Sequence, residues 1–210
     1  FLVGSDGEAV EVEGNYNLSD DMVDYWRYEG DTYIRSWEDR FGRDAGYTVT
    51  PVQTVSELFK KLKLTPKDIS KACIYGTNTR AQNGLARAMG FAPEQIPDPL
   101  LANVGNTGTA RIPMILVSAL ENDKPGDRIL AVDWGNGCDA IVFKVTDGIT
   151  KVGDRRGIKR HLNIKGPLDN YGKFLRWRNM VALAPLSRPA GGAVSMSAEW
   201  RERSLGLPLY

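Results

Sequence analysis

The sequence predicts an α/β fold. Segments with helical periodicity alternate with short apolar segments rich in β-branched residues, in the order helix, strand, helix, loop, helix, strand, strand. With 210 residues the chain can form one large domain or two small ones. Its charges balance, with 27 Lys plus Arg against 26 Asp plus Glu. We therefore expect neither a nucleic-acid partner nor a membrane partner.

The N-terminal segments predict one strand and one aromatic helix. Glu8–Glu13 alternates acidic and apolar residues, as a half-exposed strand does. The segment Met22–Phe41 predicts an amphipathic helix, because aromatic residues recur at helical spacings in Trp26, Tyr33, Trp37 and Phe41. This helix either packs on the body of the protein or forms a substrate-tunnel wall or a dimer contact.

The middle of the chain alternates between helices and strands. Thr50–Leu62 predicts a helix, since its apolar residues share one face and lysines crowd its C-terminal end. A predicted strand, Lys71–Tyr75, and a predicted helix, Thr79–Met89, follow, and Gly90 ends the helix. A turn or short helix at 65–68 precedes the strand, and an irregular connection at 93–99 follows the helix.

A turn and a hairpin complete the predicted sheet. Gly105-Asn106-Thr107-Gly108 opens a helix, and Pro113 predicts a kink in it or a later start. After a turn at 124–127, the strands Arg128–Trp134 and Ala140–Val145 are joined by the tight turn Gly135-Asn136-Gly137. The apolar run 112–120 is too short to span a bilayer.

The Gly-Asn-Thr-Gly turn is the strongest chemical signal in the chain. A turn that opens a helix can bring an amide side chain and free backbone N–H groups to one point. A carbonyl oxygen that becomes an oxyanion needs such donors. The alternative is an ordinary helix cap, because Asn and Thr favour that position as well.

The chain changes character after Gly148. Eight Lys and Arg residues between 155 and 178 make this part basic, and a Pro/Gly segment follows at 189–193. We interpret residues 1–148 as one domain and 149–210 as an extended basic arm. The arm is a solvated extension, a docking arm for a partner domain, or a phosphate-binding strip. We also interpret the chain as part of a longer protein.

Cysteine and histidine are scarce. Cys73 lies in a strand-like run, which favours a buried thiol in a cytoplasmic protein over a disulfide. Two cysteines and His161 cannot form a zinc site unaided, so we expect no metal. His161 is interpreted as a surface or tail residue.

Three motifs in this order resemble the C-terminal half of the thiolase-fold condensing enzymes. They are Ile74–Asn78 at a strand end, Val104–Gly108 before a helix, and Lys124–Leu130 leading into Trp134–Gly137. The resemblance is closest to hydroxymethylglutaryl-CoA synthase-like proteins and next to ketoacyl synthase III. It implies a thiolase-like fold, the C-terminal half of a five-layered α/β/α/β/α sandwich, which pairs as a homodimer.

The resemblance also implies site residues. Asn106 takes the position of the family's catalytic Asn, and Gly135 and Gly137 bring backbone close to the acyl group. Tyr75, Gly76, Gly105 and Thr107 are further candidate substrate-binding residues, and Asn78 is a candidate hydrogen-bond donor. Arg80 is either a ligand for a CoA phosphate or carboxylate or an exposed helix residue. Cys138 is either an acid/base thiol or a structural one.

The chain departs from the family pattern in two places. The nucleophilic Cys is absent, which we attribute to a missing N-terminal half. The histidine expected after the strand is also absent, since the sequence there is Tyr75-Gly76-Thr77-Asn78. A carbanion-forming mechanism needs a base or a polarising imidazole at that point.

Three functions follow from the resemblance. The first is an acyl-CoA condensing enzyme with Asn106 at the thioester carbonyl and with acyl-CoA as substrate rather than a bound cofactor. The second is a non-catalytic acyl-CoA-binding scaffold, whose arm docks an OB/zinc-ribbon domain in cis or in trans. The third is a thiolase- or aldolase-like carbon–carbon lyase in which Cys138 transfers a proton.

Overall fold

The computed structural model describes residues 4, 7–23, 25–152 and 157–182. The chain divides into two compact units, Phe1–Lys165 and Gly166–Tyr210. The boundary that we predicted at 148/149 from composition stays a prediction. Parts of the predicted basic arm, including Arg155, Arg156 and the segment 189–193, lie outside the described residues.

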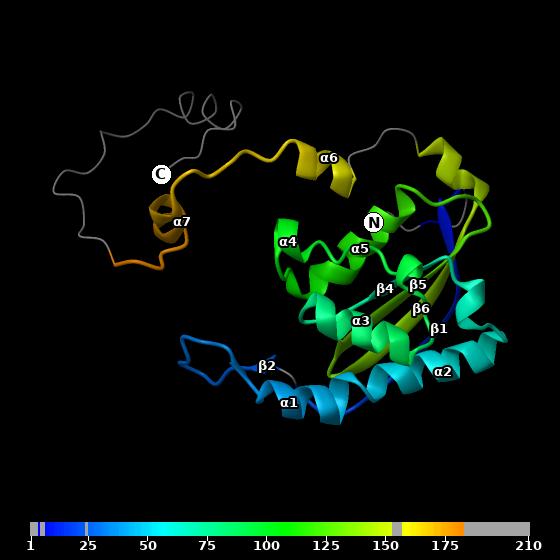
Figure 1. Ribbon diagram of the computed structural model, residues 1–210, viewed down its shortest axis with the longest axis horizontal. Helices are drawn as coiled ribbons and strands as arrows, with labels where there is room; N and C mark the ends of the chain where they lie inside the picture. The colour runs from blue at the N-terminus through cyan, green and yellow to red at the C-terminus, as the bar shows by residue number, and fades with distance from the viewer. Residues whose placement is uncertain (1–3, 5–6, 24, 153–156, 183–210) are drawn as a thin grey trace. The chain divides into compact units, whose positions relative to one another are not determined.

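A four-stranded mixed sheet forms the centre of the first unit (Figure 1). Its strand order is β1-β6-β5-β4, with β1 at Val10–Leu18, β4 at Lys71–Ile74, β5 at Arg128–Gly135 and β6 at Gly137–Val145. The pair β4/β5 is parallel, whereas β5/β6 and β1/β6 are antiparallel. The sheet confirms the α/β class and the predicted hairpin.

Helices cover the sheet. α2 (Thr50–Leu62) packs on β6, β1 and β5, while α5 (Arg111–Leu120) packs on β4 and β5 and α3 (Thr79–Ala88) on β4. The bounds of α2 are those predicted from its apolar face, and α3 ends one residue earlier than predicted. α5 starts at Arg111, after a 3-10 turn at Gly108–Ala110, so Pro113 sits in its first turn.

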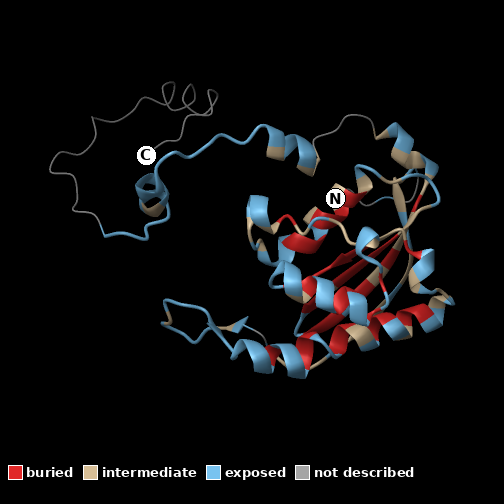
Figure 2. Cartoon of the chain, viewed as in Figure 1, coloured by how far each residue is buried: buried red, intermediate tan, exposed pale blue. Residues whose placement is uncertain are grey.

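The core lies between the sheet and these helices. Figure 2 shows buried residues concentrated on the strands and on the helix sides that face them. Strand β5 is buried on both faces from Ile129 to Val132, as a strand covered on both sides must be. Leu58 of α2 and Ile115 of α5 are fully buried. This core holds the carboxyl ends of β4 and β5 in place.

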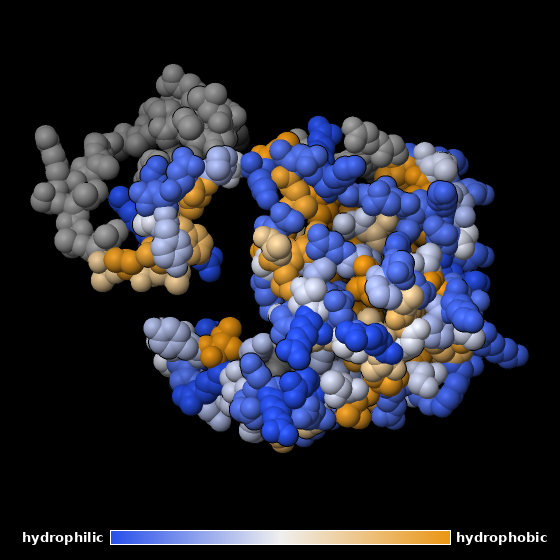
Figure 3. All heavy atoms as spheres, in the orientation of Figure 1, coloured by the Kyte–Doolittle hydropathy of each residue, from blue (hydrophilic) through white to orange (hydrophobic). Residues whose placement is uncertain are grey.

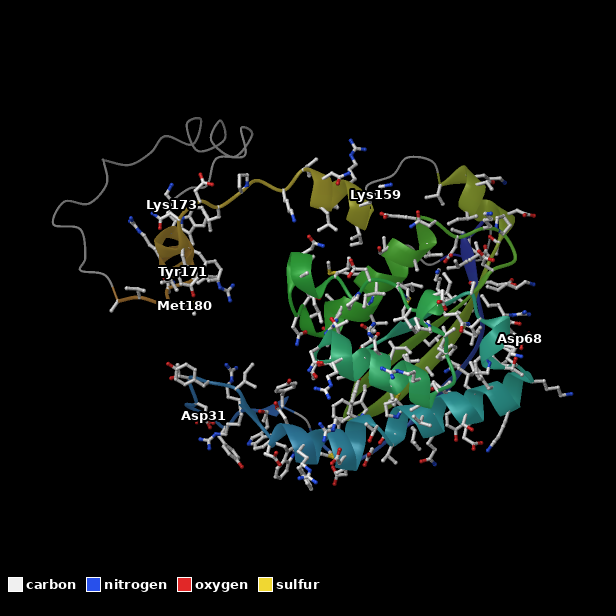
Figure 4. All side chains as sticks on the ribbon, in the orientation of Figure 1. Asp31, Asp68, Lys159, Tyr171, Lys173 and Met180 are labelled. Atoms are coloured by element: carbon white, nitrogen blue, oxygen red, sulfur yellow. The ribbon has the colours of Figure 1, made fainter. Side chains whose placement is uncertain are left out.

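The aromatic helix predicted over 22–41 is wrong. Two short strands, β2 (Tyr25–Trp26) and β3 (Arg35–Ser36), pair there as a hairpin. Gly30 adopts a φ of +83° in the connecting turn, where the Asp31 carboxylate accepts the Tyr28 N–H at 3.1 Å. Figure 4 labels Asp31 at this turn. A glycine in the left-handed region ends helical propagation, which the aromatic spacing did not reveal.

Helical structure in this region begins only after the hairpin. α1 (Asp39–Gly42) continues into a π-helical turn at Arg43–Tyr47. Three of the four predicted aromatic residues still cluster, because the Trp37 ring lies 5.1 Å from that of Trp26 and 5.2 Å from that of Phe41. Tyr33 is 81% exposed and lies outside this cluster.

The remaining elements are short. They are 3-10 turns at Pro66–Asp68, Pro93–Gln95 and Asp147–Lys151, and the helices α4 (Leu101–Val104), α6 (Ile158–Asn163) and α7 (Tyr171–Trp177). α7 belongs to the second unit. Hydrophilic side chains cover most of the viewed face of the first unit, with smaller apolar areas between them (Figure 3). Among the described residues, no helix has the length and apolar character that a membrane crossing requires.

Candidate active site

The parallel strands β4 and β5 end side by side, and aromatic residues gather there. Tyr75 follows β4 and donates its N–H to the Val132 carbonyl at 3.0 Å. The Tyr47 hydroxyl donates to the Tyr75 carbonyl at 2.6 Å, and its ring lies 5.6 Å from that of Trp134. The carboxyl edge of parallel strands is the usual place for a ligand in an open α/β sheet.

The loop between α4 and α5 presents Asn106 to this edge. Gly105 has a φ of +79°, a conformation that glycine adopts without strain. The Asn106 Oδ1 accepts the Gly108 N–H at 3.0 Å. Because a backbone N–H can only donate, this contact fixes the orientation of the amide and leaves Nδ2 as its donor.

The hairpin bend forms the third part of the site. Gly135 and Gly137 face each other across Asn136, with Trp134 opposite Cys138 and Asp133 opposite Asp139. Gly137 has a φ of +105°, and a Cβ there would lie 2.4 Å from the Leu18 carbonyl oxygen. The bend is therefore held tightly against the end of β1.

One cavity of about 940 Å³ brings these parts together. Its lining includes the predicted residues Tyr75, Asn106, Gly135, Gly137 and Cys138. The same cavity is also lined by Tyr25 and Ile34 of the hairpin segment and by Asn17, Leu18 and Ser19. A volume of this order is typical of a small-molecule site.

The other predicted residues lie elsewhere. Asn78 and Arg80 line a neighbouring cavity of about 680 Å³, which shares Tyr25 and Trp134 with the first. Asn78 caps α3, where its Oδ1 accepts the Ala81 N–H at 2.9 Å, and Arg80 is exposed. Gly76, Gly105 and Thr107 line neither cavity. His161 is an exposed residue of α6.

Gly76 lies in the stretch after β4 where the family resemblance leads us to expect a histidine. It is buried, and a Cβ built on it would lie 2.7 Å from the Gln82 Cβ and 3.0 Å from the Gln82 backbone. Its carbonyl accepts a hydrogen bond from Arg111 Nη1. The backbone of α3 therefore lies too close to residue 76 for a side chain to fit without a shift.

Both thiols are free and buried, as predicted for Cys73. Cys73 is fully buried, and burial raises the pKa of its thiol far above its ordinary value. Cys138 lines the first cavity and is 3% exposed, and burial raises the pKa of its thiol to about 12. Neither is a thiolate near neutral pH, which a nucleophile has to be.

Two carboxylates in the first cavity were not singled out from the sequence. Asp133 and Asp139 both line it, and they face each other across β5 and β6. Burial raises the pKa of Asp133, and the like charge of Asp139 raises it further. The sequence could have revealed this pair, because a tight turn centred on Asn136 places residues at equal distance on either side of it opposite each other.

The described part of the chain contains no group of three or more His, Cys, Asp or Glu residues that could hold a metal ion. The chemical groups that line the cavity include amide donors, hydroxyl groups, two carboxylates and a neutral thiol. Such a set can polarise a carbonyl and exchange a proton.

The sequence is similar to those of known proteins. Residues 59–145 match the model of the family described as 3-oxoacyl-[acyl-carrier-protein] synthase III C terminal. The hydroxymethylglutaryl-CoA synthase of Methanopyrus kandleri is 34% identical over 184 residues, and that of Methanocaldococcus jannaschii is 32% identical over 186 residues. The chain is a relative of the thiolase-like condensing enzymes.

Solved structures of these condensing enzymes show the same fold. An HMG-CoA synthase complexed with CoA superposes with a TM-score of 0.60 at 18% identity, over 79% of this chain and 47% of that one. The 3-oxoacyl-[acyl-carrier-protein] synthase III of Aquifex aeolicus gives a TM-score of 0.57 at 20% identity, over 67% and 46%. The thiolase-like fold class predicted from the motifs is thus confirmed.

The chain spans about half the length of the curated relatives it matches. The alignments cover 86% and 87% of this chain but 52% and 54% of the Methanopyrus and Methanocaldococcus synthases. The family match is to a C-terminal domain, which agrees with the predicted half.

Proposed function

We propose that the protein is an acyl-CoA condensing enzyme of the hydroxymethylglutaryl-CoA synthase-like type. The observation that carries the proposal is the cavity that joins Asn106 to the hairpin bend. The relatives named hydroxymethylglutaryl-CoA synthase support the same chemistry. We expect acyl-CoA as the substrate and no bound cofactor.

In this mechanism Asn106 holds the thioester carbonyl. Its Oδ1 is engaged by the Gly108 N–H, so Nδ2 donates to the oxygen as it becomes an oxyanion. Gly135 has open space around its Cβ position, which leaves room for an acyl group beside the backbone. The acyl-carrying cysteine is proposed to lie outside these 210 residues, since both cysteines here are buried.

Condensation also needs a group that removes a proton from the α-carbon of one acyl-CoA. No histidine lines the cavity, and the stretch after β4, where one is expected, contains none. Asp133 is the candidate base that we add here. Its raised pKa makes it a stronger base near neutral pH than an ordinary carboxylate, and it lies in the same cavity as Asn106.

The experiment uses the complete gene product with acetyl-CoA. Mass spectrometry should detect a covalent acyl adduct, and turnover of a second acyl-CoA should fall about 10²- to 10³-fold in Asn106→Ala. Asn122→Ala is the matched control, because this exposed asparagine lies outside the first cavity. Absence of an adduct on any cysteine of the complete protein would argue against a condensing enzyme.

A second candidate function is the acyl-CoA-binding scaffold. The close packing at Gly76 favours it, because no imidazole fits there without a shift of Gln82. CoA binding without turnover in the wild-type protein would support the scaffold, as would capture of an OB/zinc-ribbon domain by the basic arm. The third function is a lyase in which Cys138 transfers a proton. Loss of activity in Cys138→Ser would support it.

A further inference from the structure

Asp133 and Asp139 belong to a row of polar residues that crosses three strands of the sheet. Asp139 of β6 is the cross-strand partner of Asp133 on β5 and of Asn17 on β1. Side chains directly opposite each other on antiparallel strands share a face, with their Cβ atoms about 4.5–5.5 Å apart. All three residues line the first cavity. They therefore form one continuous part of its wall, which we call the acidic row.

Hydrogen bonds hold the central carboxylate of the acidic row. Asn15 Nδ2 donates to Asn17 Oδ1 at 3.0 Å, and Asn17 Nδ2 donates to Asp139 Oδ1. The donor to Asp139 is an uncharged amide, so this contact orients the carboxylate without neutralising it. The ion pairs of the described residues include neither Asp133 nor Asp139.

No positive side chain offsets the acidic row within the cavity. The described residues that line it include no Lys, Arg or His. Arg111 contacts the lining residue Tyr75, but it is 2% exposed, and its Nε and Nη2 atoms are closed to solvent. It therefore offers neither of these donors to a ligand in the cavity. The neighbouring cavity differs, because its lining has charges of both signs: Glu38, Asp39, Arg43 and Arg80.

Two side chains of the cavity already respond to this charge. Burial raises the pKa of Asp133, and the like charge of Asp139 raises it further. Burial also raises the pKa of the Cys138 thiol to about 12; Thr54 opposes this shift, and the two carboxylates add to it. Both shifts disfavour a further negative charge at the row. A ligand carboxylate beside it would meet the same repulsion, with less screening than in bulk water.

The rest of the lining is uncharged and suits a neutral group. Val23, Tyr25 and Ile34 supply apolar surface, while Asn106 and Asn136 supply amides. An amide or hydroxyl on the ligand can donate a hydrogen bond to the acidic row, whereas a ligand carboxylate can only accept. The cavity thus treats two ligands of the same shape differently when one of them is charged.

We propose that the acidic row makes this cavity selective for acyl groups without a negative charge, with Asp133 and Asp139 excluding acyl groups that end in a carboxylate. The inference rests on the proposed function, because it takes the ligand to be an acyl-CoA whose acyl group enters the cavity. It goes further by naming the substrate class. Discrimination arises from a repulsive element built into the wall rather than from an added attraction.

The test compares two ligands that differ in one terminal group. They are glutaryl-CoA and the CoA thioester of glutaric acid monoamide, both used as ketone analogues in which CH₂ replaces the thioester sulfur, so that no acyl group is transferred. Their CoA phosphates are identical and cancel in the comparison. Isothermal titration calorimetry of the complete gene product at pH 7 and constant ionic strength gives both Kd values, with CoA itself as reference.

The wild type should bind the amide at least about 10-fold more tightly than the carboxylate. Asp139→Asn and Asp133→Asn should each reduce this ratio, and the double variant should bring it close to one. Asparagine has nearly the shape of aspartate and keeps an oxygen that can accept from Asn17. Asp147→Asn, which removes an exposed carboxylate outside the first cavity, should leave the ratio unchanged.

Three results would overturn the selectivity while CoA binding persists. One is a wild type that binds the carboxylate as tightly as the amide, and another is a ratio that survives in the double variant. The third is an amide analogue that binds no more tightly than CoA, which would mean that the acyl group does not enter the cavity. If neither analogue nor CoA binds, the proposed function itself fails, and the selectivity that rests on it fails as well.

Discussion

Two glycines near α3 differ in what surrounds them. Gly76 faces the Gln82 backbone at 3.0 Å from its Cβ position, whereas Gly84 lies in the helix interior with nothing within 4 Å of that position. Neither has a positive φ. A methyl group at the first position must displace a helix, while one at the second only restricts the unfolded chain.

We therefore expect opposite effects from the same substitution. Gly76→Ala should lower the free energy of unfolding by about 1–3 kcal/mol, because Gln82 has to shift. Gly84→Ala should raise it by about 0.5–1 kcal/mol, because alanine favours the helix. Urea titration of both variants measures the two changes. An unchanged or raised stability in Gly76→Ala would contradict the close packing of Gln82 against Gly76.

Asp123 predicts a pH dependence of stability. Burial and, to a lesser degree, the like charge of Asp127 raise the pKa of this carboxyl from 3.8 to about 6, although Lys71 opposes the shift. The folded state then binds the proton more tightly than the unfolded state. The free energy of unfolding should thus fall as the pH rises from about 4 to about 6.

Asp123→Asn should remove this pH dependence of the free energy of unfolding, and the variant should be more stable than the wild type above pH 6. Urea unfolding at pH 4 and pH 7 checks it, with the exposed Asp21→Asn as control. If the variant loses stability on passing from pH 4 to pH 7 as steeply as the wild type, Asp123 is not the group responsible.

The residues of the site differ in how far the sequence revealed them. Asn106 and the glycines of the bend could be predicted because turn chemistry requires those residue types. Asp133 was missed although its position opposite Asp139 follows from the turn.

At the scale of elements, periodicity was reliable where one apolar face meets one surface. Thr50–Leu62 was predicted to the residue because this helix packs one apolar face on the strands of the sheet. The aromatic segment failed for the opposite reason. Its residues pack mainly on one another, so their spacing carries no information about the backbone, and Gly30 decides the turn.

The residue that caps the C-terminal end of α2 has a strained backbone conformation. Lys63 has a φ of 56° and donates its N–H to the Lys60 carbonyl. Glycine adopts this conformation more easily, so Lys63→Gly should raise the free energy of unfolding by about 0.5–1 kcal/mol. Gln53→Gly, within the helix, should lower it by about 1 kcal/mol. Destabilisation in both variants would contradict the left-handed cap.

At the scale of the whole chain, the first unit joins distant parts of the sequence. β1 pairs with β6, and Glu13 binds Arg128 across the intervening strand. α6 also belongs to this unit, since Ile158 and Leu162 pack on the core and the Lys159 N–H donates to the Glu121 carboxylate at 3.2 Å. Figure 4 labels Lys159 on this helix.

Truncation tests where the domain ends. A chain that ends at residue 165 should keep the Tm of the complete protein within a few degrees. A chain that ends at 148 should lose about 2 kcal/mol, because it exposes the apolar surface that α6 covers. Differential scanning calorimetry compares the two. Equal Tm values would support the boundary that composition predicts at 148/149.

The expected homodimer is also a property of the whole molecule. Sedimentation equilibrium of the complete gene product should give twice the monomer mass. A monomer at micromolar concentration would exclude the homodimer. It would leave the proposed site unaffected, because the cavity lies within the first unit.

The two glycines of the hairpin bend set different limits on redesign of the cavity. A side chain at 137 collides with the Leu18 carbonyl, whereas the Cβ position of 135 is open. Variants that narrow the cavity can therefore be sought by saturating codon 135 while codon 137 stays fixed. The ligand range of this protein should be adjustable at one wall and invariant at the other.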